Sequence, residues 1–86
     1  GTIIMHNVLL NANVMIGRNC IINTKSLIEH DVTIGDHSQI STWAIVNSTV
    51  TVGKKCFIGS NTVIKQTVKI KSNSFINMGT KVFKDV

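Results

Sequence analysis

The stretch Val32-Thr33-Ile34-Gly35 returns eighteen residues later as Val50-Thr51-Val52-Gly53. The same pattern occurs eighteen residues before the first of these and, less regularly, eighteen residues after the second, at Val14-Met15-Ile16-Gly17 and Val68-Lys69-Ile70-Lys71. A short period that persists along a chain is typical of a solenoid, in which each repeat stacks on its neighbour. The sequence therefore predicts a repeat protein.

Within each eighteen residues there is a shorter period of six. From Ile4 to Val82, every sixth residue is Ile, Leu or Val without a break, and the residue two places before each is small or β-branched from Val8 onward. This period does not fit an amphipathic helix, whereas alternation within each hexad suits short strands. We predict an all-β left-handed parallel β-helix of nearly five coils, with three strands per coil, spanning residues 1–86 as one domain of a longer chain. The glycines that follow several inward aliphatic residues are expected to provide φ > 0 in the turns.

The outward residue of each strand differs among the three predicted faces. Two faces carry mostly apolar residues, and the third is mostly polar. Exposed apolar columns need a partner, and a closed ring uses two different surfaces of each subunit, so we predict a homotrimer. An irregular prism that tolerates exposed apolar residues is the alternative. The columns are Ile3, Ile21, Gln39, Phe57 and Phe75; Leu9, Leu27, Ile45, Val63 and Lys81; and Met15, Thr33, Thr51 and Lys69.

Composition narrows the class of protein. Hydrophobic residues make up 43% of the chain, but no apolar run approaches the ~20 residues of a membrane helix. Cys20 and Cys56 occupy equivalent repeat positions, which favours reduced core thiols over a disulfide. We therefore expect a soluble, cytoplasmic protein that does not act at a membrane.

The basic residues are concentrated in the C-terminal part of the chain. The net charge is +5, and seven of the nine basic residues lie between Lys54 and Lys84. This favours an anionic ligand there, such as the phosphates of a nucleotide-like cofactor, with a merely solvated surface as the alternative. Nucleic acid is not expected as a partner, because the chain has only three Phe and one Trp on which bases could stack.

His30 is the main candidate for chemistry. It lies two residues after the inward Ile28, at a turn, and Asp31 beside it could hold one ring nitrogen. Stacking by eighteen residues places Ser48 in the next coil, where a backbone N–H could stabilise the oxyanion formed when a nucleophile attacks a thioester. An ordinary surface histidine is the alternative.

The run from Ile22 to Asp36, with Asn23-Thr24 and Glu29-His30-Asp31, resembles the C-terminal domain of bacterial sialic acid O-acetyltransferases and UDP-amino-sugar N-acetyltransferases. The hexad pattern is shared by many acyltransferases, and this run narrows the resemblance. It implies an acetyl-CoA-dependent enzyme that acetylates an amino or hydroxyl group of a sugar or nucleotide sugar. It also implies a left-handed trimer with three active sites between its subunits.

The resemblance further implies roles for individual residues. His30 corresponds to the catalytic base, and Asp31 to the acidic residue that tunes its basicity. Acetyl-CoA contacts fall at Gln39, Ser60 and Met78, and the oxyanion amide falls near Ser48. No metal is implied.

Three departures from the family pattern affect the cofactor contacts more than the base. The family usually has a histidine at Gln39, a small residue at Trp43 and glycines around Asn47-Ser48. His37 is directed differently from Gln39 and is interpreted as an exposed turn residue.

Two other functions fit the predicted fold. A metal-dependent carbonic anhydrase would need three converging histidines, whereas His6, His30 and His37 belong to different coils or corners. A non-catalytic β-helical trimerisation module is the stronger alternative. The acceptor sugar, and whether nitrogen or oxygen is acetylated, does not follow from these residues.

Overall fold

The chain is a left-handed parallel β-helix. The computed structural model describes residues 1–86 and contains fourteen strands of two residues each, with no helix. The strands form three parallel sheets, here called faces A, B and C. Face A consists of β1 (Ile3–Ile4), β4 (Ile21–Ile22), β7 (Gln39–Ile40), β10 (Phe57–Ile58) and β13 (Phe75–Ile76). Face B consists of β2 (Leu9–Leu10), β5 (Leu27–Ile28), β8 (Ile45–Val46), β11 (Val63–Ile64) and β14 (Lys81–Val82). Face C consists of β3 (Met15–Ile16), β6 (Thr33–Ile34), β9 (Thr51–Val52) and β12 (Lys69–Ile70).

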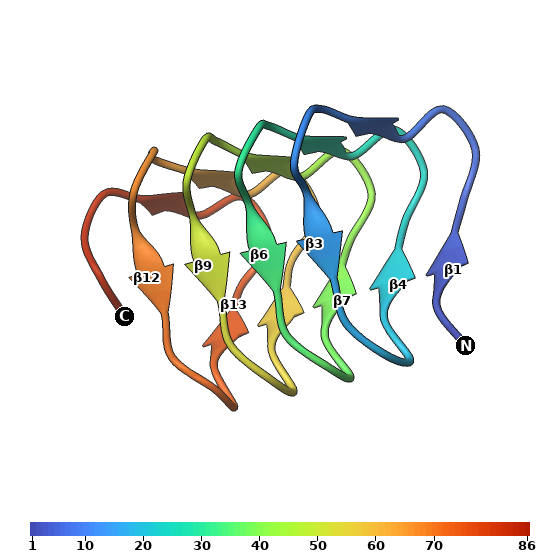
Figure 1. The fold of residues 1–86 in the computed structure, drawn as a ribbon. Coiled ribbons are helices and arrows are strands. Elements are labelled where there is room, and N and C mark those ends of the chain that lie inside the picture. Colours follow the sequence, from blue (N-terminus) through green and yellow to red (C-terminus); the bar gives the residue numbers. More distant parts are fainter.

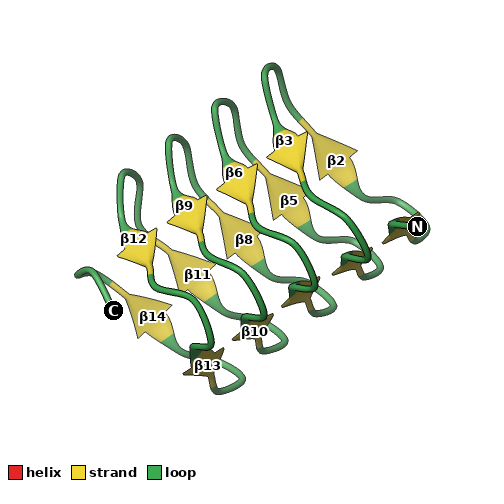
Figure 2. Ribbon diagram, turned by 60° about the horizontal axis from the view of Figure 1, so that its bottom comes forward, coloured by secondary structure: helices red, strands yellow, loops and turns green.

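The three sheets form the sides of a triangular prism, and the two termini lie at its opposite ends (Figure 1). Every strand pairs in parallel with the strand eighteen residues away, as Ile21 pairs with Gln39 and Gln39 with Phe57. The fold and the stacking predicted from the hexad are therefore confirmed. Figure 2 shows the coils stacked in order from the N-terminal to the C-terminal end. None of the elements is a helix of the length and apolar character that crossing a membrane requires.

The interior of the prism is filled by the two inward positions of each hexad. The core contains seventeen buried hydrophobic residues, among them the central ladder Ile22, Ile40 and Ile58. Cys20 and Cys56 lie in this core as free thiols, as predicted. The buried hydroxyls also have partners: Ser26 donates to the Ser41 carbonyl and Ser38 to that of Gly53. Every buried side-chain N or O atom is hydrogen-bonded, which avoids the cost of burying an unpaired polar group.

The turns correct one expectation from the sequence. Left-handed φ values occur at every sixth residue from Asn7 to Gly79, three places after the inward aliphatic residue, and not at the glycines that directly follow that residue. Asparagine tolerates this conformation better than other side chains, and it occupies five of these positions. Gly35 and Gly59 are required for space instead. A Cβ at Gly35 would lie 2.6 Å from the Gly53 carbonyl carbon, and one at Gly59 would lie 2.5 Å from the Met78 nitrogen.

The turns between faces stack into three corners. Corner AB joins faces A and B, corner BC joins B and C, and corner CA joins C and A. Backbone N–H groups in these turns donate to carbonyls of the preceding coil, as Thr49 does to His30 at 3.1 Å and Asp31 to Ala12 at 3.0 Å. The corners are therefore fixed by the same ladder that fixes the strands, and a side chain at a corner projects from a rigid support.

The last turn departs from this register. In the regular coils, a face C amide donates to the carbonyl seventeen residues further on, as Gly53 does to Ile70, but Lys71 donates to Val86, fifteen residues on. The turn after β14 is thus two residues shorter than the others. The Asp85 carboxylate accepts the hydrogen bond of the Lys69 amide at 2.8 Å, where a backbone carbonyl would otherwise serve.

Candidate active site

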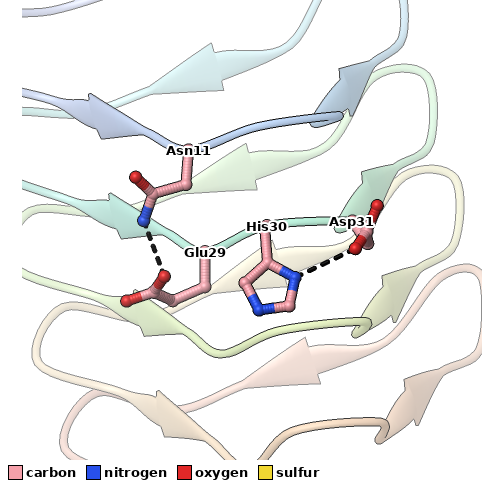
Figure 3. Close-up of polar contacts among 4 residues, drawn as sticks. All are labelled: Asn11, Glu29, His30 and Asp31. Atoms are coloured by element: carbon pink, nitrogen blue, oxygen red, sulfur yellow. Dashed lines mark hydrogen bonds and ion pairs between the residues drawn. The ribbon is translucent and has the colours of Figure 1, made fainter.

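His30 and Asp31 form a hydrogen-bonded pair at corner BC, between β5 and β6. The Nδ1 atom of His30 lies 2.9 Å from Oδ2 of Asp31, and the two side chains are 56% and 50% exposed. Figure 3 shows the imidazole beside Asp31, with Glu29 turned instead toward Asn11. When Nδ1 donates to the carboxylate, the lone pair of the neutral ring is on Nε2. His30 can therefore accept a proton from a group at the surface.

Asp31 is held from two sides. The hydrogen bond from His30, together with a weaker one from Asn13, lowers the pKa of Asp31 below its ordinary value of 3.8. Glu29 accepts a hydrogen bond of 2.6 Å from the Asn11 amide. Asn11 and Asn13 each lie eighteen residues before their partners, so the preceding coil supports both acidic side chains of this corner.

Ser48 lies one coil above His30, as predicted from the eighteen-residue spacing. Its backbone N–H donates to no acceptor in the chain. At the equivalent turn positions of corner CA, the amides of Arg18 and Lys54 donate to Asp36 Oδ1 and Ser72 Oγ, each eighteen residues further on. The amides at these positions therefore point toward the next coil. The Ser48 amide is thus available to a ligand at corner BC, although His30 and Ser60 have equally free N–H groups.

The other three predicted residues lie elsewhere on the prism. Gln39 is half-buried on face A, and its side chain makes no hydrogen bond within the chain. Ser60 and Met78 stack on each other at corner AB, where Met78 is exposed. Within one chain, face B separates corner AB from the His30 corner. The structure thus brings together His30, Asp31 and Ser48, but not Gln39, Ser60 or Met78.

The remaining histidines and Trp43 lie at the surface. His37 is an exposed turn residue, as expected. Trp43 is exposed at corner AB, with the Lys25 ammonium 5.1 Å from the centroid of its ring. No group of three or more His, Cys, Asp or Glu side chains is placed to hold a metal ion.

Comparison with known proteins identifies the family. A family model described as the GMPPB C-terminal domain matches residues 1–85 of the chain. The chain belongs to this family. No curated protein matches it. The expected hexapeptide-repeat β-helix is thereby supported by a family match over nearly the whole chain.

Among solved structures, the chain is similar to the acetyltransferase domain of PglB from Neisseria gonorrhoeae FA1090. The TM-score is 0.77 at 13% sequence identity, and the match covers all of this chain and 51% of that one. The chain thus spans about half the length of that structure. At this identity the similarity establishes a shared fold, and it agrees with the resemblance to acetyltransferase domains expected from the sequence.

In this member of the GMPPB C-terminal domain family, the residues that support the acidic side chains of corner BC are not evident from residue type alone. Asn13 occupies a left-handed turn position, where asparagine is common for conformational reasons alone, so its residue type does not reveal a contact with Asp31. The signal that could have found them is the same spacing of eighteen, which places Asn13 beside Asp31 and Asn11 beside Glu29. An asparagine eighteen residues before an acidic corner residue is therefore a candidate hydrogen-bond donor to that carboxylate.

The lowered pKa values of Asp31 and Asp36 predict how this domain responds to acid. The pKa of Asp36 is also lowered, chiefly by the hydrogen bond from the Arg18 amide. A depressed carboxyl pKa stabilises the fold above the ordinary value of 3.8, and that contribution is lost as the pH falls through the lowered folded value. NMR titration of the carboxyl carbons should give midpoints below 3.8 for both Asp31 and Asp36.

The His30→Ala variant supplies the control for this titration. It should raise the midpoint of Asp31 and leave that of Asp36 unchanged, because only Asp31 is bonded to His30. An unchanged Asp31 midpoint would show that the pair does not persist in solution.

Proposed function

We propose that this domain is the catalytic part of an acetyl-CoA-dependent sugar acetyltransferase. The observation that carries the proposal is the His30–Asp31 pair, which leaves Nε2 of the imidazole free at an exposed corner. The acetyltransferase domain with a similar fold and the sequence resemblance around Glu29-His30-Asp31 also support it. The acceptor is a sugar or nucleotide sugar with a free amino or hydroxyl group.

In the proposed reaction, Nε2 of His30 accepts the proton of the acceptor amine or hydroxyl as that group attacks the thioester carbonyl. Asp31 holds Nδ1 and stabilises the imidazolium that forms. The Ser48 amide donates to the developing oxyanion. When the carbon–sulfur bond breaks, the proton held on His30 passes to the leaving thiolate, which restores the neutral ring.

The proposed cofactor contacts require a second subunit. Gln39, Ser60 and Met78 lie on face A and corner AB, separated from His30 by face B. In a trimer, a neighbouring chain can bring its own copies of these residues to the His30 corner. We therefore propose three sites between subunits, with His30, Asp31 and Ser48 from one chain and Gln39, Ser60 and Met78 from the next.

The outward columns support a homotrimer as the working assembly. Face A carries the exposed Ile3, Ile21 and Phe75, and the half-buried Phe57 stacks on Phe75 with the ring centroids 4.9 Å apart. Face B exposes Leu9 at its N-terminal end. We predict that sedimentation equilibrium will give three times the chain mass, and that a Phe75→Glu variant will weaken the assembly. A stable monomer in the wild-type protein would contradict the trimer.

A second candidate function is a non-catalytic assembly module. The observation that favours it is the extent of apolar surface on faces A and B, which an assembly needs whether or not His30 acts in catalysis. In that case faces A and B would mediate the same self-association, and corner BC would be an ordinary polar surface.

The test is an acetyl-transfer assay with the full-length protein. Labelled acetyl-CoA is incubated with a panel of amino sugars, neutral sugars and their nucleotide derivatives, and the label in each product is measured. Transfer to one of these acceptors supports the enzyme. Absence of transfer by a protein that sediments as a trimer supports the assembly module.

A further inference from the structure

A groove lies over the C-terminal coils of face B, next to corner BC. Its volume is about 240 Å³, and β11, β14 and the turns that follow β8, β11 and β14 supply its walls. Figure 2 shows β14 and β11 at the C-terminal end of face B. Pockets that enclose a whole drug-sized ligand measure roughly 300–1,000 Å³. This groove is therefore suited to one end of a larger ligand.

Two lysines give the groove a positive charge. Lys65 and Lys81 both line it, and no acidic residue does. The four acidic side chains of the chain are engaged elsewhere: Glu29 with Asn11, Asp31 with His30, Asp36 with the Arg18 amide and Asp85 with the Lys69 amide. No lysine or arginine side chain lies within ion-pair distance of a carboxylate. The charges of Lys65 and Lys81 thus have no carboxylate partner within the chain.

The other walls combine polar and apolar groups. The Gln66 amide lines the groove, as does Asn47, whose Nδ2 is already committed to the Ile64 carbonyl at 2.9 Å. Val63 and Phe83 provide apolar surface, and Phe83 is exposed in the shortened last turn. Like charges that converge on a groove favour an anion, and phosphate oxygens accept hydrogen bonds from ammonium and amide groups together. The aromatic ring could then contact a planar or aliphatic part of the same ligand.

We propose that this groove binds the diphosphate of a nucleotide-type ligand, with Lys65 and Lys81 contacting the phosphates and Phe83 the adjoining group. Such a diphosphate can come from the acyl donor or from a nucleotide-sugar acceptor. Asn47 directly precedes Ser48 in the chain, and Gln66 stacks one coil above Ser48. A bound diphosphate would therefore extend from the groove toward the Ser48 amide. Binding in this groove can be measured directly. The proposal can therefore be tested whether or not His30 acts as a base.

The test is calorimetric titration of the full-length protein with inorganic pyrophosphate, ADP, UDP and coenzyme A at low salt. We expect binding that weakens as salt is added. Lys65→Met and Lys81→Met keep much of the apolar stem, and each should weaken binding about three- to tenfold, with a larger loss in the double variant. Tighter binding of coenzyme A than of UDP assigns the groove to the donor, and the reverse order assigns it to the acceptor.

Two control variants make the test specific. Lys71→Met removes the same charge at corner CA, outside the groove, and should leave the affinity unchanged. His37→Asn, which changes an exposed turn histidine at corner CA, should also bind as the wild type does. Because binding is measured directly, a failed catalytic proposal leaves this result intact. The proposal is overturned if the wild-type protein binds none of the four compounds at millimolar concentration. It is equally overturned if the double lysine variant, folded by circular dichroism, binds them as tightly as the wild type.

Discussion

A His30→Ala variant is expected to transfer acetyl groups about 10²- to 10⁴-fold more slowly than the wild-type protein, the usual contribution of a positioned general base. The loss should fall mainly on kcat, because the imidazole acts on the proton released during attack and not on the binding of either substrate. The measurement is the initial rate with labelled acetyl-CoA over a range of acceptor concentrations, which separates kcat from KM.

Two further variants separate catalysis from structural damage. His37→Asn changes another exposed turn histidine, and asparagine suits its left-handed φ of 61°, so its rate should match the wild type. Asp31→Asn removes the negative charge beside Nδ1 and should give a smaller loss than His30→Ala. A native rate in His30→Ala would remove His30 from the mechanism and leave the assembly module as the better interpretation.

The largest effect on stability is expected from Ile40→Ala. Ile40 is fully buried in the middle of the core ladder, stacked between Ile22 and Ile58. Deleting its outer carbons leaves a cavity that neighbours in adjacent coils cannot close, because their positions are fixed by the ladder hydrogen bonds. We expect a loss of about 2–5 kcal/mol in the free energy of unfolding, measured by urea denaturation.

Ile4→Ala is the matched control. Ile4 occupies the same hexad position on the same face, but in the first coil it is 47% exposed, whereas Ile40 is 0% exposed. The same substitution there should cost less than about 1 kcal/mol, since fewer of its carbons are removed from water. Equal losses at the two positions would show that the first coil is covered in the assembled protein, or that the core ladder is not the main source of stability.

The candidate site was predictable in part. The residue types and the spacing of eighteen gave His30, Asp31 and Ser48 at one corner, and the structure places them there. The groove was not predictable, because it depends on how side chains of β11, β14 and the turns after β8, β11 and β14 are arranged around one space. The concentration of lysines suggested an anionic ligand, but only the structure shows that Lys65 and Lys81 line one surface.

The sequence by itself determined the β-helix, its strand positions and its stacking, because an aliphatic residue recurs every six positions without a break and the pattern repeats every eighteen. The repeat of eighteen also determined which residues share a column. Only the tertiary structure decided why Gly35 and Gly59 are glycines, which turn residues take left-handed φ values and which charges stay unpaired. Those properties depend on contacts between neighbouring coils at distances of 2.5 to 3.1 Å, which a pattern of residue types does not specify.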